Sequence, residues 1–324
     1  MTFNGIRQPL CSFVFLQRQF WFVMDGMAER QELVGHRIYG GRGIFLEGCK
    51  RHGVFPELCA IIDSIRLLCE CRLMTDFVTA PDGVRIAYEV LGEGEPIILV
   101  HGFGSSRIIN WGAPGWCDTL TRADHRVVAL DCRGHGDSDK PHEVAAYDPA
   151  RMTGDIALVM DAAGTPRAAV MGYSMGGSLT LRLAYEHPER VSRAVIGGVG
   201  EVYFSRDQAW RDAIAEALTT SDTSALTPVQ WMFRDFAMKP GKDVIALAAC
   251  MSAPKHHLSR EQLATISMPT LIVCGEKDTV SGAPEPLAEA LCNARAVVVP
   301  KRDHMLTVGD RLYKAAVLDF LEQS

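Results

Sequence analysis

Gly172-Tyr-Ser174-Met-Gly176 follows the short apolar run 168–171 and precedes the helix-like stretch 177–184. A Gly-x-Ser-x-Gly pattern alone is a weak signal, and it becomes informative only between a strand and a helix. A sharp strand-to-helix turn strains the backbone of its central residue, and glycines remove the Cβ atoms that would collide there. The pattern therefore predicts that the Ser174 hydroxyl projects from the end of a strand, beside a helix N-terminus that favours developing negative charge.

Outward from this turn, the chain from Met74 onward alternates short apolar runs with helical patterns. The predicted strands, expected to be buried on both faces of a parallel sheet, are residues 97–100, 127–130, 168–171, 194–196, 270–273 and 296–299. Before them, 76–80 and 84–90 flank a Pro-Asp-Gly turn and predict a hairpin. The expected fold class is α/β, with a mostly parallel central sheet flanked by helices.

Two helices show apolar stripes. The first carries Met152, Ile156, Val159 and Met160 at helical spacing, which predicts one face packed against the sheet. The second, at the C-terminus, has a broader stripe made of Leu312, Ala316, Leu318, Phe320 and Leu321.

Between residues 201 and 267 no apolar strand run appears, and we expect a helical cap inserted into the domain. Its large apolar residues are Tyr203, Phe204, Trp210, Trp231, Met232, Phe233, Phe236 and Met238. As a group they predict an apolar roof over a site, while each one alone also fits the insertion's own core.

Residues 1–73 follow no sustained helical or strand period and hold five of the ten cysteines. We interpret them as a poorly specified N-terminal extension, translated upstream of a true start at Met74, and place the domain at 74–324. The spacing of Cys49, Cys59, Cys69 and Cys71 matches no common zinc framework, so we expect no metal there.

The composition excludes several classes of protein. Among 324 residues, 48% are hydrophobic and 22% charged, which is typical of a globular chain. The net charge is −6 without a basic run, so we expect neither nucleic acid nor anionic lipid as a partner. Residues 13–23 are interrupted by Gln17-Arg-Gln19 and match neither a membrane span nor a secretion signal. A soluble, cytoplasmic protein with reduced thiols is expected; its oligomeric state is left open.

A serine hydroxyl is nearly inert at neutral pH and requires a base, with an acid to orient that base. His304 lies in the loop after run 296–299, and Asp278 lies in the loop after run 270–273. Catalytic groups gather at the carboxyl ends of parallel strands, so both are expected near Ser174. The alternatives for the acid are Glu276, Asp303 and Glu201.

Acyl chemistry also requires donors for an oxyanion. The backbone N–H of Met175 and that of Phe103, in His101-Gly-Phe-Gly104, are the candidates. If loop 101–104 were an ordinary glycine turn, the N–H of Met175 would be the single donor for the oxyanion.

The remaining histidines receive structural interpretations. His101 and His135 are expected to order the backbone of glycine loops, and His187 to end a helix. The pair His256-His257 is expected on the polar surface of the cap.

From Met74 onward the chain resembles the α/β-hydrolase superfamily. The resemblance is carried, in the family's order, by five motifs: His101-Gly-Phe-Gly104, Asp131-Cys-Arg-Gly-His-Gly-Asp-Ser138, Gly172-Tyr-Ser-Met-Gly-Gly177, Gly275-Glu-Lys-Asp278 and Asp303-His304. It implies the order nucleophile, acid, histidine, which Ser174, Asp278 and His304 obey. It also implies a structural role for loop 131–138, with Arg133 and Asp137 ion-paired rather than catalytic.

The resemblance implies hydrolysis without metal or organic cofactor. Members with an aspartate nucleophile are disfavoured because the position is Ser174. We expect a small-molecule substrate, a small carboxylic ester or lactone, cleaved through an acyl-enzyme on Ser174 in a modest apolar pocket. The alternatives are carbon–carbon bond hydrolysis of a vinylogous diketone by the same triad, and a ligand-binding protein that has kept the fold but not the turnover.

Overall fold

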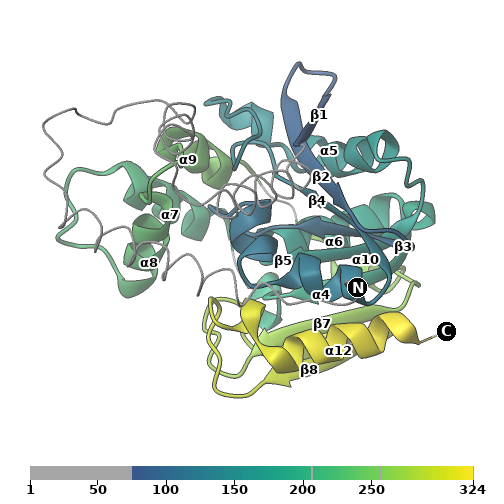
Figure 1. The fold of residues 1–324 in the computed structure, drawn as a ribbon. Coiled ribbons are helices and arrows are strands. Elements are labelled where there is room, and N and C mark those ends of the chain that lie inside the picture. Colours follow the sequence, from purple (N-terminus) through teal and green to yellow (C-terminus); the bar gives the residue numbers. More distant parts are fainter. Residues whose placement is uncertain (1–74, 206, 255–256, 324) are drawn as a thin grey trace, which may run out of the picture. The chain divides into compact units, whose positions relative to one another are not determined.

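The computed structural model describes residues 75–205, 207–254 and 257–323 (Figure 1). The chain divides into two units, Met1–Arg72 and Leu73–Ser324, and the second contains all the elements described below. The hypothesis of an extension at 1–73, with its cysteines, lies outside the described residues.

The centre of this unit is an eight-stranded sheet with the order β1-β2-β4-β3-β5-β6-β7-β8. The strands are β1 (Asp76–Thr79), β2 (Arg85–Leu91), β3 (Glu95–Val100), β4 (His125–Leu130), β5 (Ala168–Tyr173), β6 (Val191–Gly197), β7 (Thr270–Gly275) and β8 (Ala294–Val299). The pairs β1–β2 and β2–β4 are antiparallel, and every later pair is parallel. The predicted α/β architecture and its mostly parallel sheet are confirmed.

The sheet buries its two faces under different helices (Figure 1). Along β3, Ile98 and Val100 join a cluster that includes the apolar stripes of α5 (Pro149–Ala162) and α6 (Met175–Glu186). Ile97 and Leu99 point to the other face, where α4 (Trp116–Arg122) and α12 (Arg311–Glu322) pack. Alternate residues of a strand face opposite ways, so one apolar run serves both layers.

Two details of the predicted core are wrong. β8 is an edge strand and its residues are mostly half-buried, because it pairs with β7 alone. In α12 the fully buried face is Tyr313, Val317 and Phe320, whereas Leu312 is 55% exposed. Of the expected stripe, Phe320 belongs to this face, while Ala316, Leu318 and Leu321 are only partly buried beside it.

The segment between β6 and β7 is helical, and its described residues form no strand. It contains α7 (Gln208–Thr219), α8 (Pro228–Ala237), α9 (Val244–Ser252) and α10 (Arg260–Leu263). Ile214 of α7 and Met251 of α9 form a small cluster against which Phe103 and Phe233 pack. The large apolar residues of this segment therefore do not all form a roof, because Trp231 and Met238 are exposed.

The remaining elements are the short helix α11 (Glu285–Ala288) and the single turns η1 (Ile108–Gly112), η2 (Val144–Tyr147), η3 (Pro188–Arg190), η4 (Glu201–Phe204) and η5 (Thr307–Gly309). None of the helices in the described ranges is long and apolar enough to cross a membrane.

Candidate active site

Ser174 occupies the turn between β5 and α6 with a backbone φ of 54° and ψ of −112°. Its neighbours leave no room for larger residues: a Cβ at Gly172 would stand 2.1 Å from the Gly176 carbonyl oxygen, and one at Gly176 would stand 2.0 Å from that of Val100. The Ser174 N–H donates to the Gly197 carbonyl at 2.7 Å. The turn therefore holds a serine in a conformation that few non-glycine residues adopt, as its glycines predicted.

The structure brings Ser174, His304 and Asp278 together. His304 Nε2 lies 3.0 Å from Ser174 Oγ, and His304 Nδ1 lies 2.8 Å from Asp278 Oδ2. His304 comes from the loop between β8 and η5, and Asp278 from the loop after β7. The three loops meet at the carboxyl edge of the sheet because β5, β7 and β8 run parallel.

Asp278 is held as a carboxylate by its surroundings. Only 4% of the residue is exposed, and burial by itself raises the pKa of its carboxyl group. The hydrogen bond from His304, the attraction to that ring, and hydrogen bonds from Ser281 outweigh burial, so the pKa lies below its ordinary value. Oδ1 also accepts from the N–H groups of Val280 and Ser281, both at 2.9 Å.

The alternative acids serve other partners. Glu276 accepts from the Lys301 N–H at 2.6 Å. Asp303 accepts from the N–H groups of Met305 and Leu306, at 3.0 and 2.8 Å. Glu201 is exposed, at the start of η4.

The two candidate oxyanion donors both border the cavity that contains Ser174. Met175 is the first residue of α6, and first-turn N–H groups have no partner within their own helix. Phe103 follows Gly102, where an added Cβ would stand 3.4 Å from Ser174 Cβ. Gly104, with φ of +67°, turns the chain after it.

Two histidines order glycine loops, as expected. His101 Nδ1 lies 2.8 Å from the Gly102 carbonyl oxygen, and its Nε2 accepts from the Cys132 N–H at 3.0 Å. Burial lowers the pKa of His101, so the neutral ring is favoured. His135 Nδ1 lies 2.9 Å from the Arg133 carbonyl oxygen.

Of the histidines near helices, one lies as predicted and one does not. His187 is the C-cap residue of α6, as expected. The prediction of a polar surface position for His257 is wrong: its ring stacks on Tyr203 with centroids 4.3 Å apart, and it borders the cavity. His256 lies outside the described residues.

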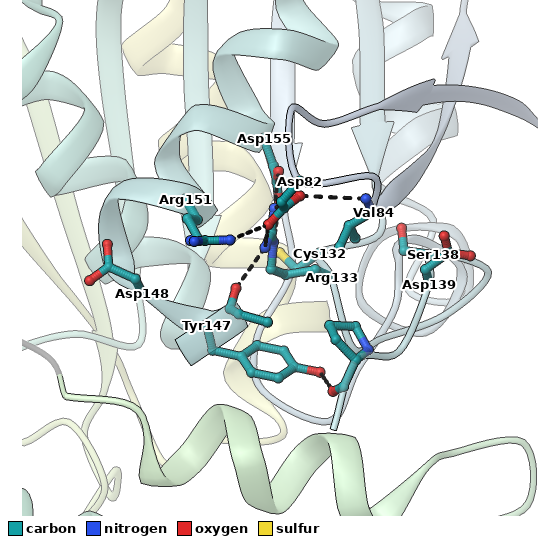
Figure 2. A network of polar contacts seen from close by, with 12 residues as sticks. Asp82, Val84, Cys132, Arg133, Ser138, Asp139, Tyr147, Asp148, Arg151 and Asp155 are labelled. Carbon is teal, nitrogen blue, oxygen red and sulfur yellow. Dashed lines mark hydrogen bonds and ion pairs between the residues drawn. The ribbon is translucent and has the colours of Figure 1, made fainter. Parts of the chain in front are cut away.

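Arg133 and Asp137 are both ion-paired, as expected, but not with each other. Arg133 binds Asp155 at 2.7 Å and Asp82 at 2.8 Å, so it ties the β1–β2 turn to α5 (Figure 2). Asp137 instead pairs with Arg107 at 2.8 Å. The two side chains of loop 131–138 thus reach different elements.

Arg107 has no motif that distinguishes it in the sequence. It also pairs with the buried Asp131 and so fixes the loop after β3 to the loop after β4. Only the tertiary arrangement brings these loops together, which is why sequence reasoning missed it.

A small cavity of about 70 Å³, partly open to solvent, lies over Ser174. Its apolar wall includes Phe103, Met175, Val199, Trp210, Phe233 and Met251. Its polar groups include Ser178, Arg211, His257 and Ser281. Sequence reasoning missed Arg211, although its spacing from Ile214 and Leu218 places it on the apolar face of α7.

The arrangement has the parts that acyl transfer requires: a hydroxyl, an imidazole in contact with it, and a carboxylate that orients the imidazole. Within the described ranges, no three His, Cys, Asp or Glu side chains are grouped so that they could hold a metal ion.

Comparison with known proteins supplies the family. A sequence model for the alpha/beta hydrolase fold matches residues 95–233. The putative 2-succinyl-6-hydroxy-2,4-cyclohexadiene-1-carboxylate synthase of Bacillus subtilis is 28% identical over 273 residues, covering 75% of this chain and 97% of the relative. A hydrolase from Pseudomonas aeruginosa is 29% identical with a TM-score of 0.64, and covers 77% of this chain and 98% of its own.

The enol-lactonase from Burkholderia xenovorans is 27% identical, with a TM-score of 0.59 and coverage of 76% and 100%. These relatives align with nearly their whole length and with about three quarters of this chain.

Proposed function

Because this chain belongs to the α/β-hydrolase superfamily, we propose that it is a serine hydrolase which cleaves a small carboxylic ester or lactone. The observation that carries the proposal is the line of contacts from Asp278 through His304 to Ser174, at 2.8 and 3.0 Å. Hydrolase activity is common to the superfamily, and the enol-lactonase among the relatives supports an ester-type bond.

In the first half-reaction Ser174 Oγ attacks the acyl carbon while His304 Nε2 takes its proton. Asp278 accepts a hydrogen bond from Nδ1–H, which fixes the tautomer and stabilises the imidazolium. The N–H groups of Met175 and Phe103 face the oxyanion of the tetrahedral intermediate. The alcohol then leaves with the proton from His304, and Ser174 carries the acyl group.

In the second half-reaction the same imidazole takes a proton from water, which attacks the acyl carbon and releases the acid. Apart from the substrate and this water, every group in the scheme belongs to the protein. The apolar wall formed by residues such as Trp210 and Phe233 suits a small acyl or lactone group.

The test compares Ser174→Ala with Ser178→Ala, a serine one turn further along α6 that borders the same cavity. With p-nitrophenyl acetate and a set of lactones, we expect Ser174→Ala to lose about 10³-fold or more in kcat. Ser178→Ala should stay within about tenfold, because its hydroxyl has no role in the scheme. Full turnover by Ser174→Ala contradicts the proposal.

Two further measurements distinguish this proposal from the two alternatives, a ligand-binding protein without turnover and a carbon–carbon bond hydrolase. A fluorophosphonate should label Ser174 rapidly in an enzyme and slowly in a binding protein that has lost turnover. A vinylogous diketone hydrolysed faster than every ester and lactone would assign carbon–carbon bond cleavage instead.

A further inference from the structure

Arg211 is one of three buried arginines in the described part of the chain, and it alone makes no ion pair there, although the charge of Asp212 is near enough to attract it. Arg107 and Arg133 each pair with two aspartates or more. Arg211 is 8% exposed, and no ion pair joins it to a described carboxylate. The neighbouring Asp212 accepts instead from the side chain of Gln208, at 2.8 Å.

The guanidinium of Arg211 is fixed by backbone rather than by charge. Its Nη2 donates to the carbonyl oxygens of Cys250 and Met251, at 3.1 and 2.7 Å. These carbonyls lie near the C-terminal end of α9, where they have no partner within the helix. Such a helix end offers about half a negative charge, so it orients the cation without neutralising it.

Among the described residues, the only hydrogen-bond acceptors of Arg211 are these two carbonyl oxygens. Nε is buried and has no hydrogen-bond partner among the described residues. Burial lowers the pKa of the guanidinium, but arginine keeps its proton in proteins. A permanent cation is therefore held in a poorly solvated place, an arrangement that costs free energy and is found where an anion binds.

Arg211 borders the same cavity as Ser174, Phe233 and Trp210. Among the described residues of its wall, only Arg211 carries a permanent charge. A bound molecule that contacts Ser174 is therefore within the same enclosure as an unneutralised cation.

We propose that Arg211 binds a free carboxylate of the substrate, so that the natural substrate is an ester or lactone that also carries a carboxylate. This inference rests on the proposed function, because it assumes that the acyl carbon lies at Ser174. One guanidinium matches one negative charge, whereas a phosphate dianion would leave an unpaired charge among apolar side chains. The site thus selects a half-ester of a dicarboxylic acid, or a lactone acid, over a neutral ester.

The experiment uses two esters of one skeleton: the p-nitrophenyl monoester of glutaric acid and its methyl ester, in which the carboxylate is blocked. The readout is the ratio of kcat/KM for the acid to kcat/KM for its methyl ester. We expect this ratio to exceed one in the natural protein and to fall about 10- to 100-fold in Arg211→Gln, which keeps an amide donor for α9 but loses the charge. Arg211→Lys should restore part of the ratio.

The matched control is Arg234→Gln. Arg234 is also a cap arginine that donates to a carbonyl oxygen, that of Ala217 at 2.5 Å, but it does not border the cavity. Its replacement should leave the ratio unchanged. A purely structural role of Arg211 would lower both rates together and would also leave the ratio unchanged.

Two results overturn the inference while the proposed function stands: a ratio of one or less in the natural protein, or a ratio that Arg211→Gln leaves as it was, with hydrolysis still dependent on Ser174. If neither ester is hydrolysed, the proposed function fails, and a binding measurement then tests whether Arg211 binds a carboxylate. Calorimetry with monomethyl glutarate should then show binding to the natural protein that weakens at least tenfold in Arg211→Gln, and an absence of binding overturns the site.

Discussion

The hydroxyl of Tyr173 donates a hydrogen bond to the backbone carbonyl oxygen of His304, at 2.5 Å. Tyr173 directly precedes Ser174, and its ring lies 5.4 Å from the imidazole between centroids. Tyr173, at the end of β5, therefore contacts His304 twice: at its backbone carbonyl oxygen and at its imidazole ring. Burial raises the pKa of Tyr173 well above its ordinary value, so the phenol remains a donor.

Tyr173→Phe should lower kcat about tenfold with little change in KM, because the imidazole loses one constraint on its position. The buried carbonyl of His304 also loses a donor, and we expect a stability loss of about 1 kcal/mol. Steady-state kinetics and urea unfolding measure the two effects.

Tyr313→Phe is the control for this substitution. Tyr313 is buried near Tyr173, and its hydroxyl has no hydrogen-bond partner among the described residues. Both kcat and stability should stay close to those of the natural protein. A kcat loss as large in Tyr313→Phe as in Tyr173→Phe would show that the hydrogen bond to His304 is not the cause.

Asp278→Asn should lower kcat about 10³- to 10⁴-fold, because an amide favours the wrong tautomer of His304. Asp303→Asn is the matched control, since Asp303 adjoins His304 in sequence but accepts from backbone N–H groups. It should cost only a few-fold. Equal losses in both variants would argue against Asp278 as the orienting acid.

Asp82 predicts a pH dependence of stability. Hydrogen bonds from Arg133 and Arg151 outweigh partial burial and lower the pKa of Asp82 to about 2 (Figure 2). A depressed carboxyl pKa stabilises the fold above the unfolded value of about 4 and loses that contribution as pH falls toward about 2. Asp82→Asn should cost about 1 kcal/mol at pH 7, less than the full shift implies, because the site is partly solvated.

Urea unfolding at pH 7, 5 and 3 measures this effect. The difference between Asp82→Asn and the natural protein should be constant from pH 7 to 5 and shrink at pH 3. Arg151→Gln removes only the more exposed ion pair and should cost less than about 0.5 kcal/mol. A difference that grows as the pH falls would refute the assignment.

Gly176→Ala should destabilise the fold by about 2–3 kcal/mol, because the new methyl group meets the backbone of Val100. Gly154→Ala is its counterpart in α5, where an added Cβ has no atom within 4 Å. That change should stabilise the protein by about 0.5–1 kcal/mol through helix propensity. Thermal melts compare the two variants, and opposite signs are expected.

We also propose that residues 74–324 suffice for folding and activity, since the sheet, its two apolar layers and the Ser174 site all lie within the unit that begins at Leu73. A chain shortened to begin at Met74 should melt cooperatively and keep its esterase kcat. Aggregation of the shortened chain, or loss of its turnover, would assign residues 1–73 a necessary role.

The sequence predicted best what local pattern and chain order determine. Continuous apolar runs marked the parallel strands, and loops at the carboxyl ends of such strands meet at one edge, so Ser174, Asp278 and His304 could be placed together. The hairpin at 76–90 followed from its Asp-Gly turn.

Side-chain pairing between distant loops was not predictable in the same way. Arg133 and Asp137 are close in sequence, but their partners lie in α5, the β1–β2 turn and the loop after β3. The prediction of burial failed where burial depended on tertiary position, as at β8 on the sheet edge and at His257 within the helical insertion.

The helical insertion between β6 and β7 supplies Trp210, Arg211 and Phe233 to the cavity, while Ser174 and its two partners come from the sheet. On the proposed function, a large part of the recognition surface is thereby encoded apart from the triad, although Phe103, Val199 and Val280 also border the cavity. Random substitutions restricted to residues 201–267 could change which substrates bind without altering Ser174, Asp278 or His304. This stretch is therefore the natural target for directing the enzyme toward new compounds.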